Sequence, residues 1–495
     1  MDHPPPPAEL WSLREDVHVE TAEGGAVVVH SRWGSTGLPE ATPAEREALH
    51  RMSLGPVMLE NVVADPVGRR ALLAGLLARL AHLMVRSLRL GAGQPLLSVV
   101  PLTPASGHRP AALDRDLPVR LSRFAVLRGD GREYVLESPL ALHRVVLHRP
   151  EAVWAMAALA RPVTLAEAGR ALPAAALADV LPDVLGALVA TGIAVQARAV
   201  GPPVFDEDDD PVLALWSPVD LMFHTRSTLG RHDHDFGETR PRGAAASDGT
   251  VVRPPASLPA VLLFRPRWDA LVAGDPPLTV AVEGGRRRRD DGPPTVDEIG
   301  ELLYRTVRVR SIAGPAGVPA ATGDRPYPSL GGCYELEVYV TAADCPGLAC
   351  GCYRYDPAGH LLQPLDAAEA DVEALLDQGR TAAGLQDAPP VLLTITARFD
   401  RVHRRYEGPG YALVQKNAGA LLHLIGLVVA AMGLRGRAHH DTDIETAARV
   451  FGTDWRVESS VGAFVVGRRP PASTHSLTPV NDSAWPELAN SYFSQ

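Results

Sequence analysis

Three separated segments of the chain contain residue types that could bind a phosphate and a flat ring. The first, FHTRSTLGR (residues 223–231), places Arg226 beside Ser227 and ends at Arg231. A guanidinium next to a hydroxyl group can bind a phosphate monoester through charge-assisted hydrogen bonds. The same pair is also typical of a solvated helix start, so this segment alone leaves both interpretations open.

The second segment, RPYPSLGG (residues 325–332), is a Pro-x-Pro turn that runs into two glycines. Glycines let the backbone approach a planar ring closely, and such a turn leaves amide groups free to point at the ring. Pro328, Ser329 and Gly331 are therefore candidate contacts of a planar ligand. An ordinary loop before a strand is the alternative interpretation.

The third segment leads from Lys416 and Asn417 into an apolar run, residues 418–434, and closes with a turn at Gly433. The run is shorter than the roughly 18 to 20 residues of a membrane span, so it predicts a buried helix. A helix that is apolar on every side needs cover from a large domain or a second subunit.

Lys416 is the only lysine among 48 Lys and Arg residues. It is either a chance survivor or an ammonium that can lose its proton near a reacting group.

The patterns around these segments predict a mixed α and β protein. Strand patterns occupy residues 334–342 and 391–399, and a helical pattern occupies residues 295–306. In the first half, two hairpin patterns followed by helical patterns predict two winged-helix-like modules. The acidic, proline-containing stretch GPPVFDEDDDP predicts an extended linker. The expected domains are residues 1–100, residues 101–200, a linker at 201–211, and residues 212–495.

Composition narrows the classes of partner. The chain has 495 residues, 46% of them hydrophobic, which is typical of a soluble multidomain protein. Its net charge is −10 and its basic residues are scattered, so we expect no nucleic-acid partner. No membrane partner is expected either. The N-terminus MDHPPPPAELW has no basic stretch followed by an apolar one, which favours a cytoplasmic location.

Taken together and in this order, the segments resemble the SagB-type azoline dehydrogenases of the FMN-dependent nitroreductase-like superfamily. The resemblance covers roughly residues 212–469 and is carried by LWSPVDLMFHTRST, RPYPSLGGCYELEVYV, GCYRYDPAGHLL, RFDRVHRRYEGPGY and AFVVGRR. It implies an α+β fold, with a nitroreductase-like FMN-binding domain preceded by the tandem winged-helix-like modules. It also implies a homodimer with FMN bound at the interface.

The resemblance implies a role for each candidate residue. Asn417 stands where the family usually has Glu, and Arg405-Tyr406 stands where it has a Lys-Tyr pair. An arginine side chain cannot act as a base, so Tyr406 is the first candidate base, favoured as the phenolate by Arg405, and Lys416 is the second. The implied cofactor-binding residues are Arg226, Ser227 and Arg231 near the phosphate, Pro328, Ser329 and Gly331 near the ring, and Asn417, Gly433 and Arg468.

Three functions are compatible with this pattern. The first is FMN-dependent oxidation of thiazoline or oxazoline rings in a heterocyclised precursor peptide, with a cyclodehydratase as a further partner. The second is an NAD(P)H-dependent nitroreductase or ene-type reductase for small molecules. The third is a non-catalytic scaffold that binds a leader peptide. A large peptide substrate would explain the first-half modules, which could supply binding energy remote from the reacting ring.

Overall fold

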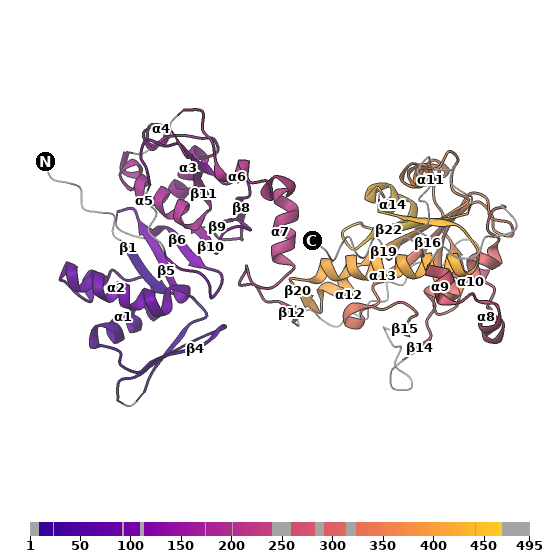
Figure 1. Cartoon of the computed structure of the whole chain (residues 1–495), viewed down its shortest axis with the longest axis horizontal. Coiled ribbons are helices and arrows are strands. Elements are labelled where there is room, and N and C mark those ends of the chain that lie inside the picture. The colour runs from indigo at the N-terminus through magenta and orange to yellow at the C-terminus, as the bar shows by residue number, and fades with distance from the viewer. Residues whose placement is uncertain are drawn as a thin grey trace, which may run out of the picture. The chain divides into compact units, whose positions relative to one another are not determined.

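The computed structural model describes residues 9–22, 24–91, 94–108, 113–173, 175–199, 201–239, 259–282, 292–312, 323–440 and 442–467. The chain divides into two compact units, Met1–Asp235 and Phe236–Gln495. Each unit has its own sheet and its own buried core (Figure 1).

The first unit is built on an antiparallel six-stranded sheet with the order β1-β5-β6-β10-β9-β8. Side chains of β10 alternate between buried and half-buried, so Val145 and Leu147 face the apolar core while Arg144 faces the other side. The strands of this sheet are β1 (Glu9–Leu13), β5 (Met84–Arg89), β6 (Pro95–Pro101), β8 (Val126–Gly129), β9 (Tyr134–Glu137) and β10 (His143–Leu147).

Helices and two small sheets complete the first unit. One apolar cluster joins α1 and α2 to β3, and a second packs α3, α4 and α5 against the six-stranded sheet. Its helices are α1 (Pro43–Leu54), α2 (Pro66–Leu80), α3 (Pro150–Ala158), α4 (Leu165–Ala171), α5 (Ala175–Thr191), α6 (Asp206–Asp209) and α7 (Pro218–Arg226). The small sheets are formed by β2 (His18–Thr21), β3 (Val27–Ser31) and β4 (Gly34–Leu38), and by β7 (Val119–Leu121) and β11 (Ala194–Gln196).

The predicted hairpins and helices of the first half are present, but the predicted boundary near residue 100 is wrong. β6 spans Pro95–Pro101 and pairs with β5 on one side and β10 on the other. The continuous hydrogen-bond ladder therefore joins the two predicted modules into one sheet. Their assignment as winged helices stays a prediction.

The acidic stretch is folded, so the linker predicted at residues 201–211 is also wrong. Asp206–Asp209 forms the short helix α6, and Glu207 is 5% exposed. The Glu207 carboxylate accepts hydrogen bonds from the Ser122 hydroxyl (2.6 Å) and the Arg123 amide (3.0 Å). These contacts hold the stretch on the first unit, and the boundary between the units follows Asp235.

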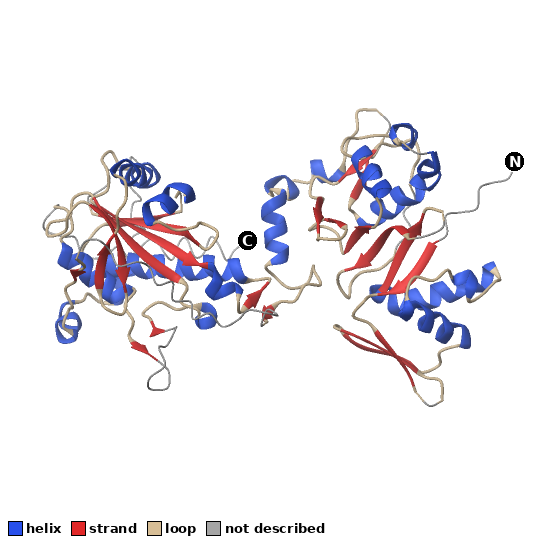
Figure 2. Ribbon diagram, turned by 180° about the vertical axis from the view of Figure 1, so that it is seen from behind, coloured by secondary structure: helices blue, strands red, loops and turns tan. Residues whose placement is uncertain are grey.

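The second unit contains a seven-stranded antiparallel sheet with the order β13-β18-β17-β16-β19-β22-β21 (Figure 2). Every residue of its central strands β16 and β19 is buried, as expected for strands covered on both faces. The strands are β13 (Val261–Leu262), β16 (Leu336–Ala342), β17 (Gly351–Asp356), β18 (Leu361–Pro364), β19 (Val391–Arg398), β21 (Gly436–His439) and β22 (Glu458–Val466). Two short pairs lie outside it, β12 (Gly237–Glu238) with β20 (Tyr406–Glu407) and β14 (Ser311–Ile312) with β15 (Gly323–Asp324).

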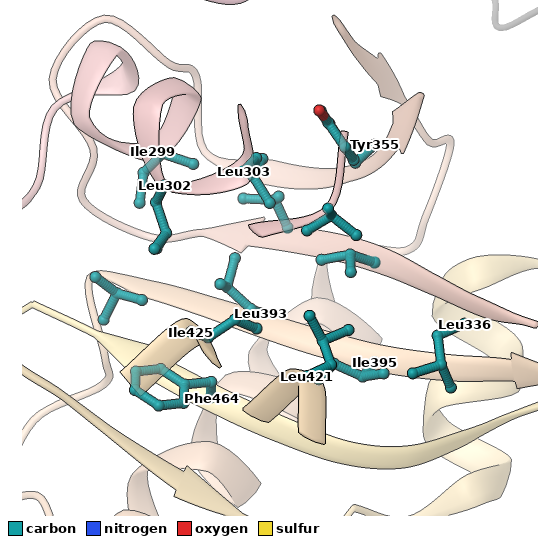
Figure 3. Packing of buried hydrophobic residues seen from close by; sticks show 14 of the residues in the cluster. Ile299, Leu302, Leu303, Leu336, Tyr355, Leu393, Ile395, Leu421, Ile425 and Phe464 are labelled. Atoms are coloured by element: carbon teal, nitrogen blue, oxygen red, sulfur yellow. The ribbon is translucent and has the colours of Figure 1, made fainter. Parts of the chain in front are cut away.

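Helices cover both faces of this sheet. On one face, α10 and α13 pack Leu302, Leu421 and Ile425 against strand residues such as Leu393 and Phe464 (Figure 3). On the other face, α11 and α14 pack against Tyr339 and Leu392. The helices of this unit are α8 (Trp268–Gly274), α9 (Leu278–Val282), α10 (Val296–Thr306), α11 (Glu369–Ala383), α12 (Phe399–His403), α13 (Gly410–Ala431) and α14 (Ile444–Phe451). The predicted strands and helices of this half are confirmed.

Helix α13 is long and apolar enough to cross a membrane by length and composition, with a mean hydropathy of 1.5. It packs on β22, β21, β16 and α10, which makes it a core helix of the second unit. Only 39% of its most apolar window is buried within the chain. The rest borders a groove of about 780 Å³ lined by Gly419, Gly426 and Ala430 of α13 and by Phe464 of β22.

We expect this uncovered face of α13 to hold the chain in a homodimer, since an apolar face of this size is rare on a monomer. Light scattering of the full chain should give twice 52.7 kDa. Replacing the half-buried Leu427 with Glu, in the wall of the same groove, should give a folded monomer. A wild-type monomer would contradict the prediction.

Candidate functional site

Residues Pro328–Gly332 form an open turn directly before β16. Its 3₁₀ segment η4 covers Leu330–Gly332, and Gly331 and Gly332 have φ of 80° and 63°. Only glycine adopts such left-handed angles without strain. Pro328 and Leu330 are exposed, and a Cβ placed on Gly332 would meet nothing within 4 Å. The turn therefore presents an accessible, partly apolar surface.

Asn417 of α13 holds this turn in place through hydrogen bonds. Its side chain is 1% exposed and accepts a hydrogen bond from the Leu330 amide at 2.8 Å. Its Nδ2 donates to Ser329 Oγ at 3.4 Å, and Ser329 Oγ accepts from the Tyr334 amide at 3.1 Å. Two segments separated by more than eighty residues are thus joined, while the roles of Ser329 and Asn417 in cofactor binding stay predictions.

Glu335 belongs to the same cluster and was not among the predicted site residues. Its carboxyl group is fully buried, and its Oε1 accepts a hydrogen bond from Asn417 Nδ2 at 2.9 Å. Burial raises the pKa of Glu335 above its ordinary value of 4.5, against the smaller opposing effects of the Asn417 hydrogen bond and two nearby arginines. The strand pattern at residues 334–342 contains two glutamates, Glu335 and Glu337, and no local signal distinguishes Glu335 from Glu337.

Tyr406 and Arg405 approach the turn from the short strand β20. A Cβ built on Gly331 would lie 2.5 Å from Tyr406 Oη, so the phenol ring packs directly against this glycine. Arg405 donates to the Gly331 carbonyl and, through Nε, to Glu238 Oε1 at 2.8 Å. Its guanidinium carbon is 5.6 Å from the Tyr406 ring centroid. Glu238 balances part of the Arg405 charge, which weakens the predicted effect of Arg405 on the phenolate.

Lys416 lies next to Asn417 on α13, but its side chain is exposed. Within the single chain this ammonium is therefore in contact with solvent and is not buried against the apolar helix. Of the two candidate bases, only Tyr406 lies against the turn.

The structure places Arg226, Ser227 and Arg231 in the first unit, at and after the end of α7. Arg226 forms an ion pair with Glu137 at 2.7 Å and donates to the Arg231 carbonyl at 3.1 Å. Ser227 Oγ donates to the His224 carbonyl at 3.3 Å, and Arg231 donates to the Pro139 carbonyl at 2.9 Å. A phosphate clamp at these residues would require the Arg226–Glu137 pair to open.

The Glu137 carboxylate is a strong competitor for Arg226. Burial alone would raise its pKa, but hydrogen bonds from Arg226 and Arg128 outweigh burial and lower the pKa of Glu137. It is 5% exposed, so losing one arginine would leave a buried charge with less compensation.

Gly433 lies at the far end of α13 from the turn. Its φ is 70° and it follows the last helical residue, Ala431, where a left-handed glycine ends a helix. Sixteen residues separate it from Asn417, or about 24 Å at 1.5 Å per residue. Within one chain Gly433 is thus remote from the turn, and its part in cofactor binding stays a prediction. Arg468 lies outside the described residues.

The gathered residues fit a flat ring with a hydrogen-bonding edge. Pro328 and Leu330 offer apolar contact, the two glycines allow close approach, and the buried Ser329–Asn417–Glu335 cluster holds the turn rigid. The phenol of Tyr406 is an acid–base group in direct contact with the turn.

Two family models match the chain. Residues 119–233, in the first unit, match the cyanobactin oxidase ThcOx, and residues 287–468, in the second unit, match the nitroreductase family. The chain thus carries a nitroreductase domain preceded by other modules, in agreement with the resemblance to SagB-type azoline dehydrogenases.

Individual proteins are similar over parts of the chain. A protein of Methanocaldococcus jannaschii named as a nitroreductase is 27% identical over 143 residues, which is 29% of this chain. The chain spans 66% of that relative's length.

Three solved structures are also similar. A protein from Ralstonia eutropha described as a nitroreductase is 22% identical, over 45% of this chain and 96% of its own, with a TM-score of 0.33. The Escherichia coli microcin synthetase McbBCD complex with truncated pro-MccB17 contains a chain that is 20% identical, over 39% and 73%, with a TM-score of 0.31. A protein from Desulfovibrio desulfuricans described as a nitroreductase in complex with FMN is 15% identical, over 42% and 95%, with a TM-score of 0.25.

Proposed function

Because the chain joins a cyanobactin oxidase segment to a nitroreductase family domain, we propose that it is an FMN-dependent azoline dehydrogenase. Its substrate is a ribosomally made peptide in which thiazoline or oxazoline rings are oxidised to thiazole or oxazole. The nitroreductase domain supports an oxidoreductase. The peptide-ring assignment rests on one observation: the cyanobactin oxidase segment and the nitroreductase domain occur in the same chain.

The turn and its support are the proposed ring-binding residues. Pro328, Ser329 and Gly331 would contact the isoalloxazine of bound FMN, and the buried amide of Asn417 keeps the turn in one conformation. We assign Arg226, Ser227, Arg231 and Arg468 to the phosphate as a proposal that requires the Glu137 ion pair to open.

Oxidation of an azoline removes a hydride and a proton from neighbouring ring atoms. Bound FMN supplies the hydride acceptor, and oxygen restores it. Tyr406 takes the ring proton, because its hydroxyl group is titratable and lies against Gly331 of the turn. The first unit binds the remote part of the peptide, and this binding energy orients the ring for reaction. A homodimer, a cyclodehydratase partner and a cytoplasmic location complete the proposal.

Mass spectrometry of a heterocyclised precursor peptide tests this function. Incubation with the protein, FMN and oxygen should remove one H2 for each azoline ring, while a peptide without rings should keep its mass. An unchanged heterocyclised peptide with a flavin-loaded protein would contradict the substrate assignment.

A second function is favoured by the nitroreductase family match over residues 287–468. An NAD(P)H-dependent nitroreductase or ene-type reductase for small molecules would use the same turn. NADPH would then bleach the flavin rapidly under nitrogen. A dehydrogenase that receives its hydride from the peptide should show no such bleaching.

We expect the purified protein to be yellow and to release FMN on denaturation. No G-x-G-x-x-G segment follows a strand pattern in the sequence, which disfavours a dinucleotide such as FAD. Liquid chromatography of the released cofactor distinguishes the two flavins. A protein that stays colourless after reconstitution with FMN would instead support the non-catalytic scaffold.

A further inference from the structure

Three buried polar atoms lie without a hydrogen-bond partner around the candidate flavin turn. They are Arg325 Nε, Tyr327 Oη and Glu335 Oε2, in side chains that are 7%, 1% and 0% exposed. All three residues belong to one short stretch that includes the turn. Unsatisfied polar groups at this depth are rare and often mark a functional site.

Glu335 is the member that connects this buried group to the turn. Its Oε1 accepts from Asn417 Nδ2 at 2.9 Å, and the same Asn417 accepts from the Leu330 amide at 2.8 Å. The orientation of the Asn417 amide is therefore set by the carboxyl group. If that acceptor were lost, the amide could rotate and release Leu330.

The charges around Glu335 do not amount to an ion pair. Arg401 and Arg325 act on it only at longer range, and no salt bridge joins it to any described residue. Arg401 donates to the Tyr334 carbonyl at 2.8 Å and lies 3.4 Å from Glu337, its own carboxylate partner. Tyr327 and Cys333 are further titratable groups near Glu335, and burial favours the neutral form of both by raising their pKa. Burial without a paired cation favours the neutral acid.

We propose that Glu335 is a positioning residue of the flavin site: its buried carboxyl group anchors Asn417, which fixes the Ser329–Leu330 turn against the ring. This inference rests on the proposed FMN function. The inference adds Glu335, a buried acid, to the residues that position the flavin turn.

Two substitutions of Glu335 distinguish its role as a hydrogen-bond acceptor for Asn417 from the effect of its titratable proton. Glu335→Gln keeps a neutral acceptor for Asn417, so FMN affinity near pH 6 should stay within about threefold of wild type. Glu335→Ala removes the acceptor and leaves Asn417 Nδ2 with less compensation, which should weaken FMN binding about tenfold or more. Quenching of FMN fluorescence gives both constants without any turnover.

The pH dependence supplies a readout that a simple packing role would not change. The pKa of Glu335 is raised on folding, so its stabilising contribution is complete below 4.5 and is lost as pH rises through the folded value. Thermal stability of the wild type should therefore fall with rising pH more than that of Glu335→Gln. Glu458→Gln is a matched control, because Glu458 is a buried acid bonded to Tyr339, which packs on the opposite face of the sheet.

The decisive comparison exchanges the carboxyl group of Glu335 and the amide group of Asn417 between the two positions. Asn417→Glu alone places two acids together and should weaken FMN binding. The double variant Glu335→Gln with Asn417→Glu again pairs one acid with one amide, so it should recover binding and the pH dependence. A Glu335→Gln variant with the wild-type pH dependence, or a double variant no better than Asn417→Glu, would overturn the inference. Failure of the wild type to bind FMN would overturn the proposed function itself.

Discussion

Tyr406→Phe is expected to lower the turnover of azoline rings by roughly 100-fold or more, the usual effect of losing a general base. The substitution keeps the aromatic ring that packs on Gly331 and removes only the hydroxyl group. FMN content and peptide affinity should therefore stay near wild type. Single-turnover oxidation of a heterocyclised peptide, followed by mass spectrometry, measures the chemical step alone.

Tyr304→Phe is the matched control for this experiment. Tyr304 lies on α10, where its ring contacts Arg308 and His360, and it should tolerate the same change without loss of turnover. Full activity of Tyr406→Phe would show that the phenol only packs against the turn. The base would then be Lys416, and full activity of Lys416→Arg as well would leave the proposed chemistry without a base.

The gathering of Ser329, Gly331 and Asn417 could be predicted from the sequence, because each stands in a segment with its own local signal. Proline and glycine fix the turn, and an apolar run fixes the helix that carries Asn417. Both elements, the turn and the helix, are present in the folded structure. The resemblance then supplied the pairing of the segments, which no local pattern contains.

Other parts of the site depended on contacts that a single segment does not reveal. Arg226 looked free to bind phosphate, but the chain folds the buried carboxylate of Glu137 against it. Gly433 looked like a site residue, but the length of α13 separates it from Asn417. Glu335 was not among the predicted site residues, and its link to the site is a hydrogen bond with Asn417 of α13. For Arg226 and Glu335 the deciding partner lies more than eighty residues away in sequence.

Gly331→Ala should be the most damaging small substitution in the turn. An alanine there must adopt a φ near 80°, which costs about 1 to 2 kcal/mol for a residue with a Cβ. That Cβ would also lie 2.5 Å from Tyr406 Oη and 2.7 Å from its Cζ, so the phenol must move. Misplacement of a reacting group by about 1 Å can lower a rate about 100-fold. We therefore expect a loss of turnover of that size together with weaker FMN binding.

Gly332→Ala separates the two causes, because Gly332 has a φ of 63° but a Cβ there would meet nothing within 4 Å. It shares the backbone strain and lacks the clash, so its turnover should fall about tenfold at most. Adding Tyr406→Ala to Gly331→Ala removes the clash and should restore FMN affinity to the level of Gly332→Ala, without restoring turnover. Equal turnover in the two single variants would mean that Tyr406 does not depend on Gly331 for its position. Affinity that stays low in the double variant would assign the defect to the backbone of the turn instead.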